Sequence, residues 1–261
     1  MTTRKKTEVV FITRTKGRSA LIDKEDKKLK DLVNIVQGKG IKDIYVITDY
    51  CGPDNKIGKI PVTVIKDPNP TSPTSINTVL GRIKANKKKF NAFLVCSKEV
   101  GLKKKHIGTL INEISKNFKH LLVVGYKFKI IDESLNNELK GYYNKKNLIA
   151  YKVPWNTCAI WNYKLFVKYI EKFDEITDKN PFNPVCVCID NVCSQTEHKG
   201  MEDGLAIAKA VSQRNRNIKF KLLDNEKPLT WDVGGDDDKI KKHKQKLARK
   251  ETVLRNFMAV R

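Results

Sequence analysis

The chain has 261 residues and is 40% hydrophobic, which is enough for one large α/β domain or two small ones. It has 52 Lys and Arg and 29 Asp and Glu, which gives a formal net charge of +23. This charge fits either a solvated basic face or a polyanionic partner. Such a partner would be a nucleic acid, a phosphate or diphosphate, or an anionic membrane surface. Its apolar runs are strand-sized, which excludes a membrane-spanning helix, and its N-terminus lacks a signal-peptide pattern, so we expect a soluble, cytoplasmic protein.

Short apolar runs alternate with helical patterns in the first half of the chain. Buried strands are predicted at the apolar runs 9–12, 44–47, 62–65, 92–96 and 120–126. Helices are predicted at 24–37, 76–83 and 102–114. This alternation predicts an α/β fold, with a mainly parallel central sheet and helices on both faces. Because such sheets bind ligands at the carboxyl ends of their strands, functional residues are expected in the loops that follow the strands.

From about residue 130 this alternation gives way to polar and aromatic-rich segments. A polar loop is predicted at 132–147, and an aromatic-rich segment runs from Val153 to Trp161. Helices are predicted at about 163–172 and 201–212, strands at 185–189 and 218–223, and a basic helix from about 239. Neither a repeat nor a linker-like composition divides the chain, so we predict a single domain over 1–261.

Hydroxyl and guanidinium groups follow the first predicted strand. Thr13, Arg14, Thr15 and Arg18 lie in the segment TRTKGRS. Arg pairs bidentately with phosphate oxygens, so this loop is a candidate phosphate or nucleotide contact. It is not a P-loop, because the glycine spacing and the terminal Gly-Lys-Ser/Thr are missing. An ordinary basic surface loop is the alternative interpretation.

Two further strand ends carry candidate ligand contacts. Asp49 follows the second strand and is able to accept hydrogen bonds from a ribose or a base edge, although Asp also commonly initiates a turn. Ser97, Lys98 and Glu99 follow the fourth strand, where a nucleotide-sugar enzyme often has two acids, one residue apart, that hold a divalent metal against the diphosphate. Ser97 and Glu99 supply half of such a site. Lys98 either neutralises phosphate charge itself or is a loop lysine.

A pair of carboxylates, Glu202 and Asp203, opens the helix predicted at 201–212, between Gly200 and Gly204. Acids in the first turn are favoured by the helix dipole, so a capping role explains them. The same position also aims a carboxylate out of a strand–helix junction, where it is able to act as a general base. The same helix has one apolar stripe, made by Met201, Leu205, Ala208 and Val211.

The remaining candidates are cysteines and a basic segment. Cys186, Cys188, Cys193 and His198 lack the spacing of a zinc site, and buried thiols in a reducing compartment explain the cysteines better. The C-terminal helix is expected to cover the core or, if it faces the cleft, to contact phosphate. The phosphate candidates in this helix are His243, Lys246 and Arg249.

The order of these features, over about residues 8 to 225, resembles that of the GT-A-fold glycosyltransferases of family-two type. The resemblance implies a nucleotide-binding half at about 8–128, an acceptor and catalytic half at about 129–225, and a basic C-terminal helix within 236–261. It implies nucleotide binding by Thr13, Arg14, Thr15, Arg18, Asp49, Asn77, Ser97 and Lys98. It places the acceptor side at Trp155, Asn156, Thr157 and Trp161, and the catalytic base at Asp203, with Glu202 as the alternative.

The activity implied is an inverting transfer of a sugar from a nucleotide-diphosphate sugar to a hydroxyl of a glycan, a glycoprotein or another acceptor. Glu99 is the metal candidate, and because Ser97 stands where the family has an acid, we expect weak dependence on Mn²⁺ or Mg²⁺. A peripheral association with an anionic surface also fits the charge, and no specific nucleic acid is expected. Two alternatives stay open. A nucleic-acid-binding protein is supported only by the charge. A nucleotidyltransferase would be expected to have a glycine-rich, basic first loop and two metal-binding acids, which this chain lacks.

Overall fold

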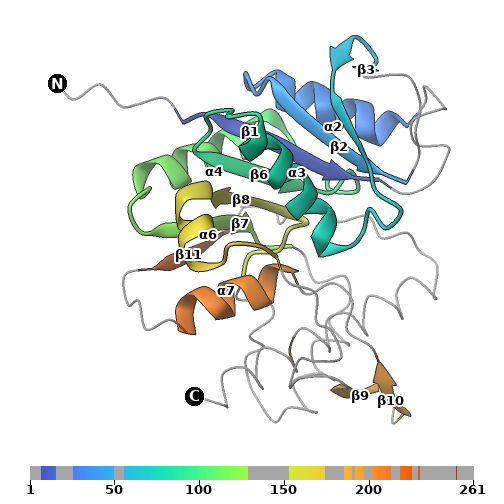
Figure 1. The fold of residues 1–261 in the computed structure, drawn as a ribbon, viewed down its shortest axis with the longest axis vertical. Coiled ribbons are helices and arrows are strands. Elements are labelled where there is room, and N and C mark those ends of the chain that lie inside the picture. Colours follow the sequence, from blue (N-terminus) through green and yellow to red (C-terminus); the bar gives the residue numbers. More distant parts are fainter. Residues whose placement is uncertain are drawn as a thin grey trace.

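The computed structural model describes residues 7–15, 26–49, 56–128, 153–173, 185–189, 192–196, 202–212, 218–224, 229 and 251. Its centre is a seven-stranded sheet with the order β11-β7-β8-β6-β1-β2-β5 (Figure 1). The strands are β1 (Val9–Arg14), β2 (Asp43–Thr48), β5 (Thr63–Lys66), β6 (Ala92–Cys96), β7 (Leu121–Tyr126), β8 (Cys158–Asn162) and β11 (Lys219–Leu223). β8 runs antiparallel to its neighbours β6 and β7, and the other pairs are parallel. The predicted α/β fold with a mainly parallel sheet is confirmed.

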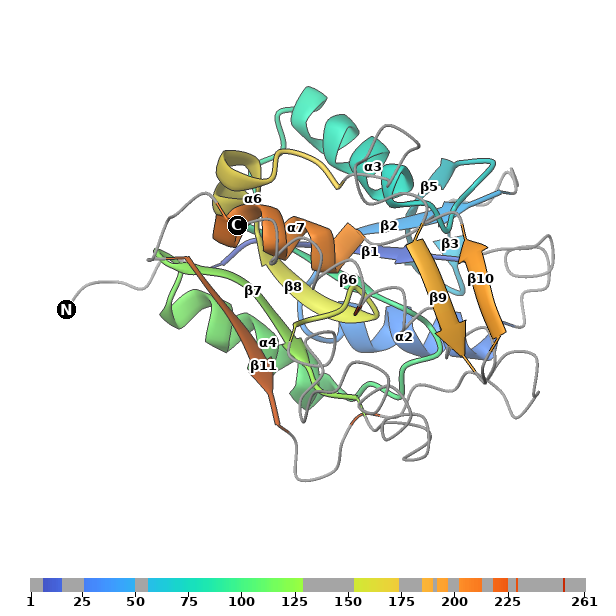
Figure 2. The ribbon, with the colours of Figure 1, turned by 90° about the horizontal axis from the view of Figure 1, so that it is seen from below.

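Helices pack on both faces of this sheet (Figure 2). One face carries α2 (Lys27–Gln37) and α4 (Lys104–Lys116), and the other carries α3 (Pro73–Ala85), α6 (Tyr163–Tyr169) and α7 (Glu202–Ser212). The alternation of side chains along β1 divides the two cores, because Phe11 packs with α2 and α4 while Val10 and Ile12 pack with the helices opposite. Two small hairpins, β3 (Lys56–Ile57) with β4 (Ile60–Pro61) and β9 (Val185–Ile189) with β10 (Val192–Thr196), lie outside the sheet.

Local signals set where the helices begin. Asp26 caps α2, since its Oδ1 accepts a hydrogen bond from the backbone N of Leu29 at 3.0 Å. Ser72 caps α3 in the same manner through the backbone N of Thr74. At the start of α4, His106 Nδ1 accepts from the backbone N of Lys103 at 3.1 Å. Of the described helices, none has the length and apolar character that crossing a bilayer requires.

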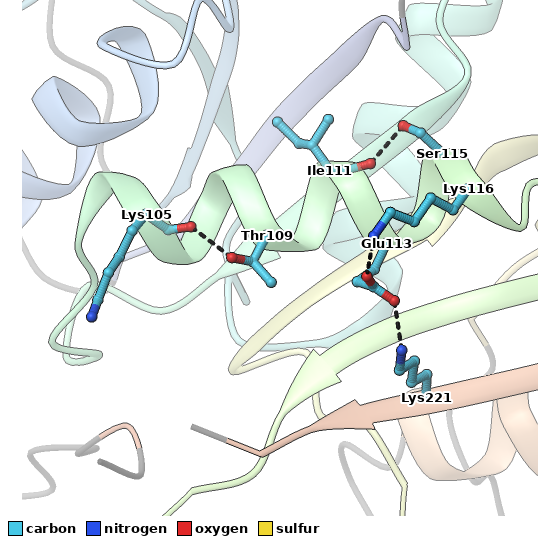
Figure 3. A network of polar contacts seen from close by, with 7 residues as sticks. All are labelled: Lys105, Thr109, Ile111, Glu113, Ser115, Lys116 and Lys221. Carbon is cyan, nitrogen blue, oxygen red and sulfur yellow. Dashed lines mark hydrogen bonds and ion pairs between the residues drawn. The ribbon is translucent and has the colours of Figure 1, made fainter. Parts of the chain in front are cut away.

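The edge strand β11 is joined to α4 by charged side chains (Figure 3). Glu113 pairs with Lys221 of β11 at 2.5 Å and with Lys116, three residues along its own helix, at 3.1 Å. Hydrogen bonds from these two lysines lower the pKa of Glu113. Both lysines are about half exposed, so each pair contributes at most about 1 kcal/mol to stability.

The strand β8 was not predicted from the sequence. All five of its residues are buried, because it lies between β6 and β7 and is covered on both faces. The same burial gives β6 and β7 continuous apolar runs, which predicted them. The β8 sequence CAIWN ends in a polar residue and belongs to an aromatic-rich segment with Pro, Asn and Thr, so no strand was predicted there. Its position in the middle of the sheet decides how the second half of the chain meets the first.

Candidate active site

The carboxyl ends of β1, β2 and β6 lie at one edge of the sheet, because the three strands are parallel and β1 pairs with both of the others. This edge therefore gathers the predicted segments 13–15, 48–49 and 97–99. β8 runs antiparallel to β6 and begins at the same edge. The backbone N of Ser97 donates to the carbonyl oxygen of Thr157 at 2.9 Å, which joins residues 155–157 to the end of β6.

At the end of β1, the three predicted residues differ in environment. Thr13 is wholly buried, and its Oγ1 has no hydrogen-bond partner among the described residues. Arg14 Nη1 donates to the carbonyl oxygens of Thr71 and Ser72 at 3.2 and 3.4 Å, which ties β1 to the start of α3. Thr15 is also buried, and its Oγ1 accepts from Lys98 Nζ at 3.1 Å.

Lys98 is the centre of a small polar cluster at the end of β6. Besides Thr15, its Nζ contacts Asp26 Oδ2 at 2.5 Å, while the other oxygen of Asp26 caps α2. The two side chains are 19% and 15% exposed, so this ion pair is largely withdrawn from water. The sequence analysis missed Asp26, whose only local signal is its position before an apolar helical pattern. We call Thr15, Asp26 and Lys98 the Lys98 cluster.

The residues at the end of β6 do not fit a divalent cation held by two carboxylates. Ser97 offers a hydroxyl, and that hydroxyl donates a hydrogen bond to Glu99, the one acid of the motif. Within the described ranges, no group of three His, Cys, Asp or Glu side chains is placed to hold a metal. Burial, followed by hydrogen bonding with neighbouring Cys158, raises the pKa of the Cys96 thiol well above its usual range, so this cysteine offers no thiolate ligand.

A cavity of about 500 Å³ opens beside the Lys98 cluster. It lies between the loop 98–102 and α2, and Lys98 and Glu99 form part of its wall. Its volume is in the range of small-molecule sites. The Lys98 side chain, 19% exposed, is therefore partly accessible.

On the acceptor side, Asp203 is held by backbone groups near the start of α7. Its side chain is buried, with Oδ2 accepting from the backbone N of Asn156 at 2.9 Å and Oδ1 accepting from the backbone N of Gly204 at 2.7 Å. Asn156 precedes Thr157, which contacts Ser97. Asp203 is thereby linked to the end of β6 through two consecutive residues. The predicted alternative, Glu202, begins α7, and its side chain lies outside the described residues.

Asn156 joins the backbone of this region to the core. Its Oδ1 accepts from Trp161 Nε1 at 2.8 Å, and its Nδ2 is buried without a hydrogen-bond partner in the described part of the chain.

The expectation that Trp161 lies on the acceptor side needs correction. Trp161 is wholly buried, stacks on Phe93 and meets Phe166 edge to face, because the alternation along β8 turns it into the core.

The expected nucleotide contact Asn77 also has a structural role. Its side-chain amide donates to the carbonyl oxygen of Phe173 at 2.7 Å and accepts from the backbone N of Phe173 at 2.9 Å. Both polar atoms of the amide are thus engaged in joining α3 to the segment after α6. The described contacts of Asn77 are therefore structural, and its contact with a nucleotide is still a prediction.

The other predicted residues divide into described and undescribed positions. Asp49 and Thr157 are half-buried at the carboxyl edge, and Trp155 is buried, with its ring stacked on Phe128 at a centroid distance of 6.1 Å. The remaining candidates lie outside the described residues: Arg18, His243, Lys246 and Arg249. The same is true of most of the segment predicted as the C-terminal helix, and of the side chains of Cys186, Cys188 and Cys193.

The described side chains of α7 test one member of its predicted apolar stripe, Ala208, which is partly buried and packs against the core. Ala206, Ile207 and Ala210 are buried together with Asp203, whereas Ala208 is only half-buried. The helix is therefore turned so that its core-facing stripe carries Asp203 toward the sheet. The side chains of the other members of the predicted stripe lie outside the described residues.

The sequence matches no protein-family profile and no curated protein. The fold matches a mannosyltransferase of Pyrobaculum calidifontis, solved with GDP-Man and Mn²⁺, with a TM-score of 0.57 and 10% identity over 92% of this chain and 61% of that one. It also matches glucosyl-3-phosphoglycerate synthase of Mycobacterium tuberculosis, solved with Mn²⁺, UDP and phosphoglyceric acid, with a TM-score of 0.53 and 6% identity over 96% and 78% of the two chains. The chain thus spans about three fifths of the mannosyltransferase. At these identities the likeness establishes the fold, which is the GT-A fold of glycosyltransferases.

Proposed function

We propose that this protein transfers a sugar from a nucleotide-diphosphate sugar to an acceptor hydroxyl, with inversion at the anomeric carbon. One observation carries the proposal. The contact between Ser97 and Thr157, and the contact between Asn156 and Asp203, link a late carboxylate to the edge where three parallel strands end. A donor site and a base are both needed at one place for this reaction, and these contacts bring the candidates for both together.

The donor is assigned to the ends of β1, β2 and β6. Arg14 and Thr15 carry donor groups suited to phosphate oxygens, and Asp49 is suited to a ribose or a base edge. Similar folds have been solved with GDP-Man or with UDP, which supports a nucleotide-diphosphate sugar as the ligand of this edge. Which nucleotide and which sugar bind is a property of the pocket shape.

In the reaction that we propose, Asp203 accepts the proton of the acceptor hydroxyl. The hydroxyl oxygen forms a bond to the anomeric carbon, and the bond from that carbon to the diphosphate oxygen breaks with its electron pair going to the diphosphate. The two backbone N–H groups fix the position of the carboxylate. The acceptor is assigned to the side of residues 155–157.

A ligand screen followed by product analysis tests this function. We expect one nucleoside diphosphate, among those of uridine, guanosine, adenosine, cytidine and thymidine, to raise the melting temperature, because a ligand that binds only the folded state stabilises it. The matching nucleotide sugar should then be consumed in the presence of an acceptor, and NMR should show the opposite anomeric configuration in the product. If no nucleoside diphosphate binds, and generic DNA binds with a steep dependence on salt, the basic charge serves nucleic acid and the proposal is wrong.

A further inference from the structure

We propose that the ammonium group of Lys98 occupies the role of the divalent cation opposite the diphosphate, so that donor binding and sugar transfer need no metal. This inference rests on the proposed function and deepens it at the same site. The structures of similar fold cited above contain Mn²⁺ together with a nucleotide. This chain has a lysine between Ser97 and Glu99, at the end of the strand that would present the metal-binding acids.

The first observation concerns the ligands that the end of β6 offers a divalent cation. Mg²⁺ and similar hard cations at diphosphates are held by carboxylate oxygens. Ser97 contributes a neutral hydroxyl, which instead donates to the carboxylate of Glu99. A positive side chain between these two residues also repels a cation, since like charges at short range disfavour each other.

The second observation concerns how firmly Lys98 is positioned. Its Nζ donates to Thr15 Oγ1 at 3.1 Å and to Asp26 Oδ2 at 2.5 Å, so that β1, β6 and the start of α2 all meet at the ammonium. A lysine on a surface loop would sample many rotamers, whereas this side chain is only 19% exposed. A charge that is oriented before the reaction begins stabilises developing charge without the cost of reorganisation.

The third observation concerns access. Lys98 lines the cavity of about 500 Å³ beside α2, and its side chain is 19% exposed, so it is not sealed in the core. An ammonium has three N–H donors, and the described contacts with Thr15 and Asp26 use two of them. Asp26 serves as a positioning residue, because it orients Lys98 and reaches the ligand only through it.

The chemical role follows from the balance of the transfer step. When the bond between the anomeric carbon and the diphosphate breaks, negative charge grows on the departing phosphate oxygen. Lys98 stabilises that charge by a charge-assisted hydrogen bond and gives up no proton. The proton released in the step is the acceptor's, and it goes to Asp203. Neither an oxidant nor a second co-reactant is required.

Calorimetric titration of the full chain with the nucleoside diphosphate found in the screen tests the inference, with excess EDTA in one arm and with Mn²⁺ or Mg²⁺ in the others. We expect the parent to bind with dissociation constants that agree within about twofold in all arms. Lys98→Gln should weaken binding of the diphosphate about tenfold or more, and binding of the corresponding monophosphate by less than about threefold. Lys42→Gln is the matched control, because it removes the same charge from the opposite end of β2 and should change neither affinity.

The metal arms with the parent keep the test informative if Lys98→Gln folds poorly, because they need no substitution. Ser97→Asp combined with Lys98→Ala creates two acids at the spacing of a metal motif, and we expect it to bind the diphosphate only when Mn²⁺ is added. Parent binding that requires a divalent ion overturns the inference and leaves the proposed function standing. Equal weakening by Lys98→Gln and Lys42→Gln also overturns it, since only bulk charge would then matter. If the parent binds no nucleoside diphosphate in any arm, the proposed function fails, and this inference fails with it.

Discussion

The two sides of the candidate site are held together in different ways. On the donor side, at residues 13–15, 48–49 and 97–99, charged side chains are paired and partly accessible, as the Lys98 cluster shows. On the acceptor side, Asp203 and Asn156 are buried and hydrogen-bonded to backbone or to a core tryptophan. Partly accessible ion pairs are able to exchange partners with a charged ligand, whereas buried hydrogen bonds fix geometry. We therefore expect donor-side substitutions to act on affinity and acceptor-side substitutions to act on turnover or on folding.

The largest effect is expected at Asp203. Asp203→Asn removes the basicity of the side chain, and turnover should fall by about 10²–10⁴ while affinity for the nucleoside diphosphate stays within about threefold. The variant also turns an NH₂ group toward one of the two backbone N–H donors, so the melting temperature should fall by a few degrees. Steady-state kinetics, calorimetry and thermal melting separate the three effects.

Glu202→Gln is the matched control for this variant, and its turnover should stay within about threefold of the parent. If Glu202→Gln abolishes transfer and Asp203→Asn does not, Glu202 is the catalytic base. If neither change reduces transfer, the two acids only stabilise the start of α7, and the acceptor side does not supply the catalytic base.

The next effect is expected on folding. Trp161→Ala removes a wholly buried indole that contacts Phe93 and Phe166 and donates to Asn156, so the free energy of unfolding should fall by about 3–5 kcal/mol in urea denaturation. Phe220→Ala on β11 truncates an aromatic residue that is 38% exposed, and it should cost less than about 1 kcal/mol. Similar losses from both variants would contradict the placement of Trp161 in the core.

A smaller effect is expected on the donor side. Asp49→Ala removes a carboxylate from the end of β2, and affinity for the nucleoside diphosphate should fall about tenfold, the amount expected for a hydrogen bond to a charged group. Asp43 is a suitable control, since it lies at the other end of the same strand and pairs with Lys88. Calorimetry should show unchanged affinity for Asp43→Ala. Equal losses from the two variants would mean that the ligand does not use the carboxyl end of β2.

The smallest effect is expected away from both sides, at His106. Burial lowers the pKa of this imidazole, and the nearby charges of Lys105 and Lys103 lower it further. A group with a lowered pKa in the folded state must gain its proton at a cost, so its contribution to stability is complete above the unfolded pKa of about 6.5 and is lost as the pH falls through the folded pKa.

The variant His106→Gln keeps an acceptor for the backbone N of Lys103 and does not titrate. Between pH 7 and pH 5, its melting temperature should therefore decline less than that of the parent. Parallel declines would show that this histidine is not protonated on unfolding over that range. Nucleotide affinity should be the same in both proteins, because His106 lies at the start of α4 and not at the candidate site.

Much of the nucleotide-binding half was predictable because its signals are local. Apolar runs marked β1, β2, β5, β6 and β7, and helical periodicity marked α2, α3 and α4. Parallel strands of one sheet end at one edge. The approximate positions of Thr13, Asp49 and Ser97 therefore followed from their places at the ends of predicted strands. The roles of these residues toward a ligand are still predictions.

The second half was less predictable because its elements are defined by what they pack against. β8 is a short run inside an aromatic-rich segment, and its place between β6 and β7 is set by pairing with strands distant in sequence. Asn77 was assigned to a nucleotide, whereas its amide binds the backbone of Phe173, 96 residues further along the chain. Nothing in the neighbourhood of Asn77 in the sequence indicates that partner.

The sequence by itself determined the fold class, the ends of the strands and the chemical types of side chain at those ends, because hydrophobic periodicity and capping act over a few residues. Only the tertiary structure decided which of these side chains meet. Lys98 pairs with Asp26 across 72 residues, and Asp203 binds the backbone of Asn156 across 47. Such contacts depend on the order and direction of strands in the sheet, and a pattern that repeats every two or four residues carries no information about them.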